Sequence, residues 1–409
     1  MRPALLLGLF LLAGCANAPQ IPVSTPLPTP TSAPIPPTST ADVPAELILW
    51  VAPAFTPNPE TLAGMLLLER LEVFQNKNPD VRVIVRTKAE RGPGGLMESL
   101  SAASRAAPAT LPHLITLDPE ALSTTALIGL LSPLSELGNP SDHYAFADDI
   151  SRVGGILYAQ PFATDMETFA SEIAAFEAVP LSWTDLTFED NKFIIPAADL
   201  EATFLIAQYL SLGGEFDDAK ALDENILAEA LDFLATAAES GNLSPASFDL
   251  STSGETWLAL QERRSEAAQA PYGAFFATFD PGVHAMGPLP TRNGLGIALA
   301  ATWSWAVANP EYKELSAELM EWLSEPAFLA EWSHALGLLP TQPEVLGQWP
   351  DGPEAATASR IVSVAVAKPR GALLEAIGPP LAEAVQAVLT DRLDAEAAAA
   401  QAVSDINSS

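Results

Sequence analysis

The 409-residue chain is poor in the residues on which metal sites and nucleic-acid binding depend. It contains one cysteine and four histidines, and its 19 lysines and arginines face 51 aspartates and glutamates, for a formal net charge of −32. This charge excludes nucleic acids and anionic lipid surfaces as partners, because both are bound through lysine and arginine. The histidines lie far apart in sequence, and the motifs of zinc proteases, serine hydrolases, P-loops and dinucleotide-binding turns are missing. The sequence therefore predicts no catalytic residues, no metal and no cofactor.

The single cysteine, Cys15, follows an apolar run at residues 4–13 that comes after Arg2. A lone thiol cannot form an internal disulfide. The run is too short to cross a bilayer and is typical of a secretory signal. Leu12-Ala13-Gly14-Cys15 resembles the bacterial lipobox, in which the cysteine sulfur receives a diacylglyceryl group before cleavage. We therefore expect a signal peptide at residues 1–14 and lipidation of Cys15, the alternative being a plain secretion signal with an accidental cysteine.

Residues 15–45 form a second segment, rich in proline and threonine. Such a composition favours extended polyproline II and cannot build a packed core. We predict a disordered tether here, and we expect lipid to be the only anchor because no second apolar stretch reaches membrane length.

The remaining residues, 46–409, exceed the usual length of a single core and predict two lobes. An apolar run at 47–51 is typical of a strand that is covered on both faces, and further strands are expected at 81–85 and 114–117, with segments of helical spacing between them. Strand, helix and strand at this spacing form a βαβ unit with parallel pairing. The predicted fold class is α/β. Helical spacing at 315–323, 328–336 and 373–406 predicts further helices, which we expect to cover the second lobe.

Five motifs resemble one family when taken in order: PHLITLDPEALSTTALIGLLSPLSEL from Pro112, GILYAQPFATD from Gly155, PLSWTDL from Pro180, GPLPT from Gly287 and GLLPT from Gly337. Together they resemble the bacterial extracellular solute-binding proteins of the carbohydrate-uptake type (family 1), in lipoprotein form. The chain departs from that pattern at His113, at residues 169–172 and at residues 263–267. The contacts that the family carries at those positions cannot be transferred, so the identity of the ligand stays open.

The resemblance implies a two-lobe periplasmic-binding-protein-like fold with a ligand cleft between the lobes and a helical C-terminal region. Residues 46–160 and 286–312 would form lobe 1, and residues 161–285 and 313–409 lobe 2. The implied protein is a monomeric substrate-binding lipoprotein outside the cytoplasm that passes a mono- or oligosaccharide to an ABC permease and its ATPase. Alternatives are a lipoprotein enzyme acting on glycans, a binder of a cationic solute such as a polyamine, and a receptor that signals without transport.

Ligands of open α/β sheets bind beyond the carboxyl ends of strands. Aromatic rings and carboxylates near such ends suit sugars, because rings stack on C–H faces and carboxylates accept hydroxyl hydrogen bonds. Each aromatic candidate could instead be core, and Asp118 and Glu120 could be helix caps. The predicted ligand contacts are Trp50, Phe55, Asp118, Glu120, Thr164, Asp165, Tyr272, Phe275, Trp303 and Trp305, with Trp303 and Trp305 placed after a strand at 297–300.

Overall fold

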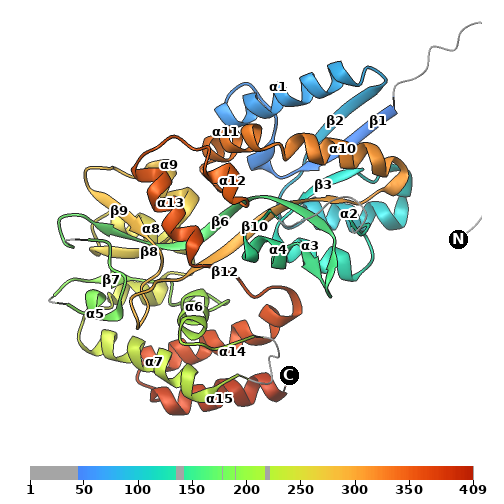
Figure 1. The fold of residues 1–409 in the computed structure, drawn as a ribbon. Coiled ribbons are helices and arrows are strands. Elements are labelled where there is room, and N and C mark those ends of the chain that lie inside the picture. Colours follow the sequence, from blue (N-terminus) through green and yellow to red (C-terminus); the bar gives the residue numbers. More distant parts are fainter. Residues whose placement is uncertain (1–44, 135–141, 177, 189, 217–221, 409) are drawn as a thin grey trace, which may run out of the picture. The chain divides into compact units, whose positions relative to one another are not determined.

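The computed structural model of the chain describes residues 45–134, 142–176, 178–188, 190–216 and 222–408. The predicted signal peptide, Cys15 and the tether as far as residue 44 lie outside the described residues. Figure 1 shows the arrangement of the elements. The strands are β1 (Ala45–Val51), β2 (Val81–Thr87), β3 (Leu114–Leu117), β4 (Arg152–Val153), β5 (Ile156–Leu157), β6 (Ala159–Glu172), β7 (Phe193–Ile194), β8 (Ala267–Pro271), β9 (His284–Gly287), β10 (Ala298–Val307), β11 (Leu339–Pro340) and β12 (Ala365–Ala367).

Most strands belong to one sheet with the order β2-β1-β3-β10-β6-β8-β7, while β9 and β11 pair with β6 and β12 pairs with β10. The pairs β1–β2 and β1–β3 are parallel, as the βαβ pattern predicts. The pairs that β10 forms with β3 and β6 are antiparallel. β6 is the longest strand, with 14 residues, and it runs through the centre of the sheet.

Helices cover the sheet (Figure 1). Thr61 caps the first of them, because its side chain accepts a hydrogen bond from the amide of Gly64. That helix therefore begins at Leu62. The helices are α1 (Leu62–Lys77), α2 (Leu96–Ala106), α3 (Pro119–Leu127), α4 (Ala145–Ile150), α5 (Trp183–Leu186), α6 (Thr203–Ser211), α7 (Glu224–Glu239), α8 (Ser253–Gln261), α9 (Tyr272–Thr278), α10 (Lys313–Leu323), α11 (Pro326–Leu336), α12 (Pro343–Leu346), α13 (Pro353–Ser363), α14 (Gly371–Leu389) and α15 (Ala395–Ser408).

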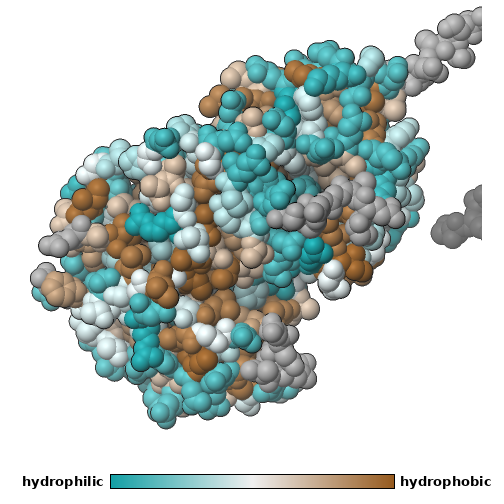
Figure 2. Space-filling view, viewed as in Figure 1, coloured by the Kyte–Doolittle hydropathy of each residue, from teal (hydrophilic) through white to brown (hydrophobic). Residues whose placement is uncertain are grey.

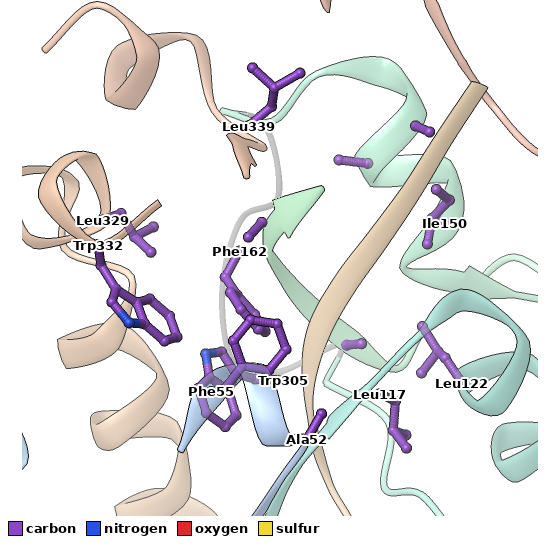
Figure 3. Packing of buried hydrophobic residues seen from close by; sticks show 14 of the residues in the cluster. Ala52, Phe55, Leu117, Leu122, Ile150, Phe162, Trp305, Leu329, Trp332 and Leu339 are labelled. Atoms are coloured by element: carbon purple, nitrogen blue, oxygen red, sulfur yellow. The ribbon is translucent and has the colours of Figure 1, made fainter. Parts of the chain in front are cut away.

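Buried apolar side chains form two clusters, which we call the first and the second core. The first core includes β1, β3, α1, α10 and α11, and Figure 3 shows Phe55, Phe162, Trp305 and Trp332 packed together within it. The second core is built mainly from β7, α6, α7, α14 and α15. β6 contributes to both, with Phe162 in the first and Phe169 in the second. In Figure 2, apolar residues gather in the middle of the face, around β10 and β12.

Two features of the last third of the chain differ from the sequence prediction. The strand expected at 297–300 continues to Val307, so Trp303 and Trp305 lie within β10 and not after it. Helices α10 and α11, which we expected to cover the second lobe, pack on α1 and belong to the first core. The reason is that β10 pairs with β3, which returns the chain to the first part of the sheet. The division into lobes at the predicted residues stays a prediction.

Helix α14 is the one helix among the described residues that is long and apolar enough to span a membrane. The expectation that no second apolar stretch reaches membrane length was therefore wrong by length and composition alone. More than half of the helix is buried, against α7 and α15, and it contains Pro379 and Pro380. These contacts are those of a core helix.

Candidate ligand-binding site

Two carboxylates, Asp165 and Glu167, stand on the same face of β6, because side chains two residues apart on a strand point the same way. They lie opposite Ala301 and Leu299 of β10. This part of the sheet, where β6, β10 and β12 run side by side, joins the elements of the two cores.

Asp165 holds the start of α9. Its Oδ1 accepts hydrogen bonds from the amides of Gly273, at 3.0 Å, and Met166, at 2.8 Å. Burial raises the pKa of the Asp165 carboxyl, and hydrogen bonds from the amides of Gly273, Met166 and Tyr272 offset part of that shift. The contacts of this side chain are those of a residue that fixes α9 against β6.

Glu167 is held by two side chains of other elements. Its Oε2 accepts from Nε2 of Gln269 at 2.8 Å, and its Oε1 accepts from the hydroxyl of Ser253 at 2.9 Å. Burial raises the pKa of the Glu167 carboxyl, while Gln269 and the positive charge of Lys368 act in the opposite direction.

The segment after β12 carries the polar contacts between the two cores. Lys368 forms an ion pair with Glu201, just before α6. Arg370 donates to the carboxylate of Asp149 at 3.3 Å and to the backbone carbonyls of Asp149 and Arg152. The amide of Gly371 donates to the Glu120 carboxylate at 2.6 Å.

Next to these contacts lies a cavity of about 400 Å³. One side comes from elements of the first core, namely α3, the end of α4 and the β4–β5 hairpin, and the other side from α6, β12 and the start of α14. Its volume is at the lower end of the range for small-molecule sites. The lining residues are Ser123, Asp149, Arg152, Val153, Gly154, Leu210, Phe216, Ala367, Lys368, Pro369, Arg370 and Leu373.

None of the ten predicted contact residues belongs to this lining, although Glu120 is close to it through Gly371. Three of the aromatic candidates, Phe55, Phe275 and Trp305, are at most 2% exposed and pack against other aromatic rings. Trp303 is partly exposed, with its ring 5.1 Å from Phe55 in an edge-on contact.

The other predicted residues also have contacts within the fold. Trp50 is 3% exposed, and the ammonium of Lys88 lies 4.7 Å from its ring. Thr164 is buried and its hydroxyl pairs with Thr302. Asp118 caps α3 by accepting from the amide of Ala121 at 2.8 Å, which confirms the cap that its position before Pro119 allows.

Tyr272 is fully buried, and its hydroxyl has no hydrogen-bond partner among the described residues. Burial raises the pKa of this phenol, with further contributions from the carboxylates of Glu354 and Asp165. It stands directly after β8, at the carboxyl end of that strand. The structure thus brings Asp165 and Tyr272 close together, and their role toward a ligand stays a prediction.

Sequence reasoning missed the basic residues of the cavity, Arg152, Lys368 and Arg370. The one available signal was the short run Lys368-Pro369-Arg370 in a chain that has only 19 lysines and arginines. No group of three or more histidines, cysteines, aspartates or glutamates among the described residues is arranged to hold a metal ion.

Solved structures share this architecture. The cyclic alpha-maltosyl-1,6-maltose binding protein of Arthrobacter globiformis aligns over 89% of this chain and 98% of its own, with a TM-score of 0.73 and 18% identity. The maltose-binding periplasmic protein of Listeria monocytogenes, solved with maltose, aligns over 89% and 97% with a TM-score of 0.73 and 15% identity. An ABC transporter solute-binding protein of Thermotoga lettingae, bound to alpha-D-tagatose, aligns over 89% and 99% with a TM-score of 0.67 and 18% identity.

At these identities the likeness shows the fold, which is the mixed α/β, two-lobe architecture of periplasmic binding proteins with a helical C-terminal region. No curated protein matches the chain. A family model described as bacterial extracellular solute-binding protein matches residues 69–357, more than half of the chain. The chain belongs to the bacterial extracellular solute-binding proteins.

Proposed function

We propose that the chain is the substrate-binding lipoprotein of an ABC importer and captures a sugar for delivery to a membrane permease. The observation that carries this proposal is a cavity of about 400 Å³ between the two cores, beside the strands that join them, in a member of a solute-binding family. Three structures with the same fold are described by their sugar ligands. The protein would act as a monomer outside the cytoplasm.

The lining of the cavity argues against the alternative of a cationic solute. It contains three basic side chains and one carboxylate, Asp149. A polyamine would meet charges of its own sign there. The overall net charge of −32 then serves solubility more than ligand attraction.

The glycan-hydrolase alternative needs a carboxylate pair about 5–9.5 Å apart that flanks the scissile bond. The buried carboxylates Asp165 and Glu167 already accept hydrogen bonds from Gly273, Met166, Gln269 and Ser253. These contacts support a structural task for both groups. Incubation with a sugar panel, followed by product analysis, separates the two functions, because an enzyme consumes the ligand and a binding protein returns it unchanged.

The binding test is a thermal-shift screen of the exported protein against mono- and oligosaccharides. A true ligand raises the melting temperature in a concentration-dependent way by mass action on the folded state. Absence of any shift with neutral and acidic sugars alike would contradict sugar binding.

The anchor is tested separately with Cys15→Ala. Two acyl chains hold a protein stably at a membrane, so we expect the variant to move from the membrane fraction to the soluble exported fraction while its ligand affinity stays the same. Unchanged membrane association would contradict lipidation of Cys15.

A further inference from the structure

The cavity between the two cores is basic in a strongly acidic protein. Arg152, Lys368 and Arg370 line it, three of only 19 lysines and arginines in the chain, whereas Asp149 is the single carboxylate of the lining among 51. Arg152 lies in β4, whereas Lys368 and Arg370 lie in the segment after β12, and the three converge because that segment lies beside the end of α4 and the β4–β5 hairpin. Such a concentration of positive charge needs a local explanation.

Each of these cations has a carboxylate partner, and the partners of Lys368 and Arg370 lie nearer to solvent than the cations, whereas Arg152 and Asp148 are about equally exposed, at 35% and 38%. The Lys368 side chain is 21% exposed and that of Glu201 44%, and the Arg370 side chain is 19% exposed and that of Asp149 65%. Water screens the more exposed member of a pair more strongly. Of the three partners only Asp149 belongs to the lining, whereas Glu201 and Asp148 do not, so the lining itself carries more positive than negative charge.

The cations also keep unused donors. The hydrogen bonds of Arg152 to Asp148 use Nε and Nη2, which leaves Nη1 without a partner among the described residues. Those of Arg370 use Nη1 and Nη2, which leaves Nε. The ammonium of Lys368 has three hydrogens and donates one of them to Glu201.

Ser123 adds a neutral group to the same lining. It is 9% exposed, and its hydroxyl forms no hydrogen bond with any other described residue. A buried hydroxyl normally has a partner. Facing a cavity, this one is available to a hydroxyl of a ligand.

We propose that the solute is an acidic sugar, a mono- or disaccharide-sized polyol with one carboxylate or phosphate group. The oxyanion would lie against Arg152, Lys368 and Arg370, since arginine forks and ammonium groups bind both kinds of oxyanion, and a sugar hydroxyl would pair with Ser123. This inference rests on the proposed function and narrows its substrate class. The neutral sugars named for the structural relatives would then be the weaker ligands.

The experiment is titration calorimetry of the exported full chain with D-glucuronate, D-galacturonate and D-glucose 6-phosphate, beside D-glucose and D-galactose as neutral counterparts. Sodium sulfate serves as a free oxyanion. The variants are Lys368→Gln and Arg152→Gln, each checked for folding by circular dichroism. The matched control is Arg392→Gln, which removes the same charge from a pair with Glu383 outside the cavity.

We expect an acidic sugar to bind at least about tenfold more tightly than its neutral counterpart, and to lose about tenfold in each cavity variant and nothing in the control. Its affinity should fall as salt rises. Comparison of the affinities for the two uronates with the affinity for D-glucose 6-phosphate shows whether the site prefers a carboxylate or a phosphate. If a variant does not fold, the comparison of acidic with neutral sugars on the wild-type protein still decides the question.

Equal or tighter binding of the neutral sugars would overturn the acidic-sugar inference and leave the proposed function standing. Sulfate that binds as tightly as the acidic sugars would overturn it as well, because the site would then recognise the anion alone. Failure of all sugars to bind would overturn both proposals.

Discussion

Phe55→Ala separates a core role from a ligand-contact role for one predicted site residue. Phe55 is 1% exposed, and its ring centroid lies 5.0 Å from Phe162, 5.1 Å from Trp303 and 5.9 Å from Trp332. Truncation of a buried phenylalanine to alanine costs about 3–5 kcal/mol of unfolding free energy. Each aromatic neighbour adds about 0.5–1.5 kcal/mol beyond area burial. We therefore expect a loss in the upper half of the range, about 4–5 kcal/mol.

The assay is urea unfolding followed by tryptophan fluorescence and circular dichroism, with the free energy obtained by linear extrapolation. Phe188→Ala is the matched control, because Phe188 is 61% exposed and the same truncation there should change the free energy by less than about 0.5 kcal/mol. A loss below about 1 kcal/mol for Phe55→Ala, together with weaker sugar binding, would refute the core assignment.

Three further predictions concern stability. Ala202 has φ +50°, so Ala202→Gly should raise the unfolding free energy by about 0.5–1 kcal/mol in urea, and a decrease would contradict strain at this position. A Cβ on Gly378 would lie 3.0 Å from the carbonyl oxygen of Leu200, so Gly378→Ala should lower the unfolding free energy by about 1–3 kcal/mol. Gly352 has open space around it, so Gly352→Ala should be nearly neutral, and equal melting temperatures of the two variants would contradict the prediction. Burial lowers the pKa of His113 below its usual value of about 6.5, so the unfolded chain binds this proton at a higher pH than the folded chain and the unfolding free energy falls as the pH drops below about 6.5. His113→Asn should lose part of that pH dependence in unfolding curves between about pH 5 and 7, and an unchanged slope would contradict the prediction.

The first strands could be predicted from the sequence because their mainly apolar segments are short and are separated by turns and by segments of helical spacing. β1, β2 and β3 lie where the runs at 47–51, 81–85 and 114–117 indicated. Residues 301–307, ATWSWAV, were harder to assign to a strand from the sequence. Polar residues alternate there with the tryptophans, and the segment is a strand because it pairs with β3 and β6. Local pattern cannot reveal such a tertiary cause.

Aromatic residues could be selected from the sequence as candidate ligand contacts, but the sequence could not show whether their rings point toward a ligand or into the core. The sequence shows that Phe55 and Trp305 follow or belong to strands, but both faces of this sheet are covered, so a ring can point into the core as readily as toward a ligand. Asp118 illustrates the opposite case, since the Asp-Pro pair predicts a helix cap from local chemistry alone and the cap is present. The basic residues of the cavity that the sequence did not reveal, Arg152 and Lys368, come together only through the long-range return of the chain in β12.

The position of β10 has a consequence for how the protein folds as it is made. The first core needs β1 near residue 45, but also β10 and helices α10 and α11, which end at Leu336. A nascent chain can pair β1 with β2 and β3 early, but β3 has no β10 beside it, and the first core stays incomplete, until the last third of the chain is made. Long-range pairing of this kind folds slowly and leaves hydrophobic edges open to association. Folding of this chain thus depends on its last third, and protection of β3 until that part of the chain is available should decide the yield of native protein.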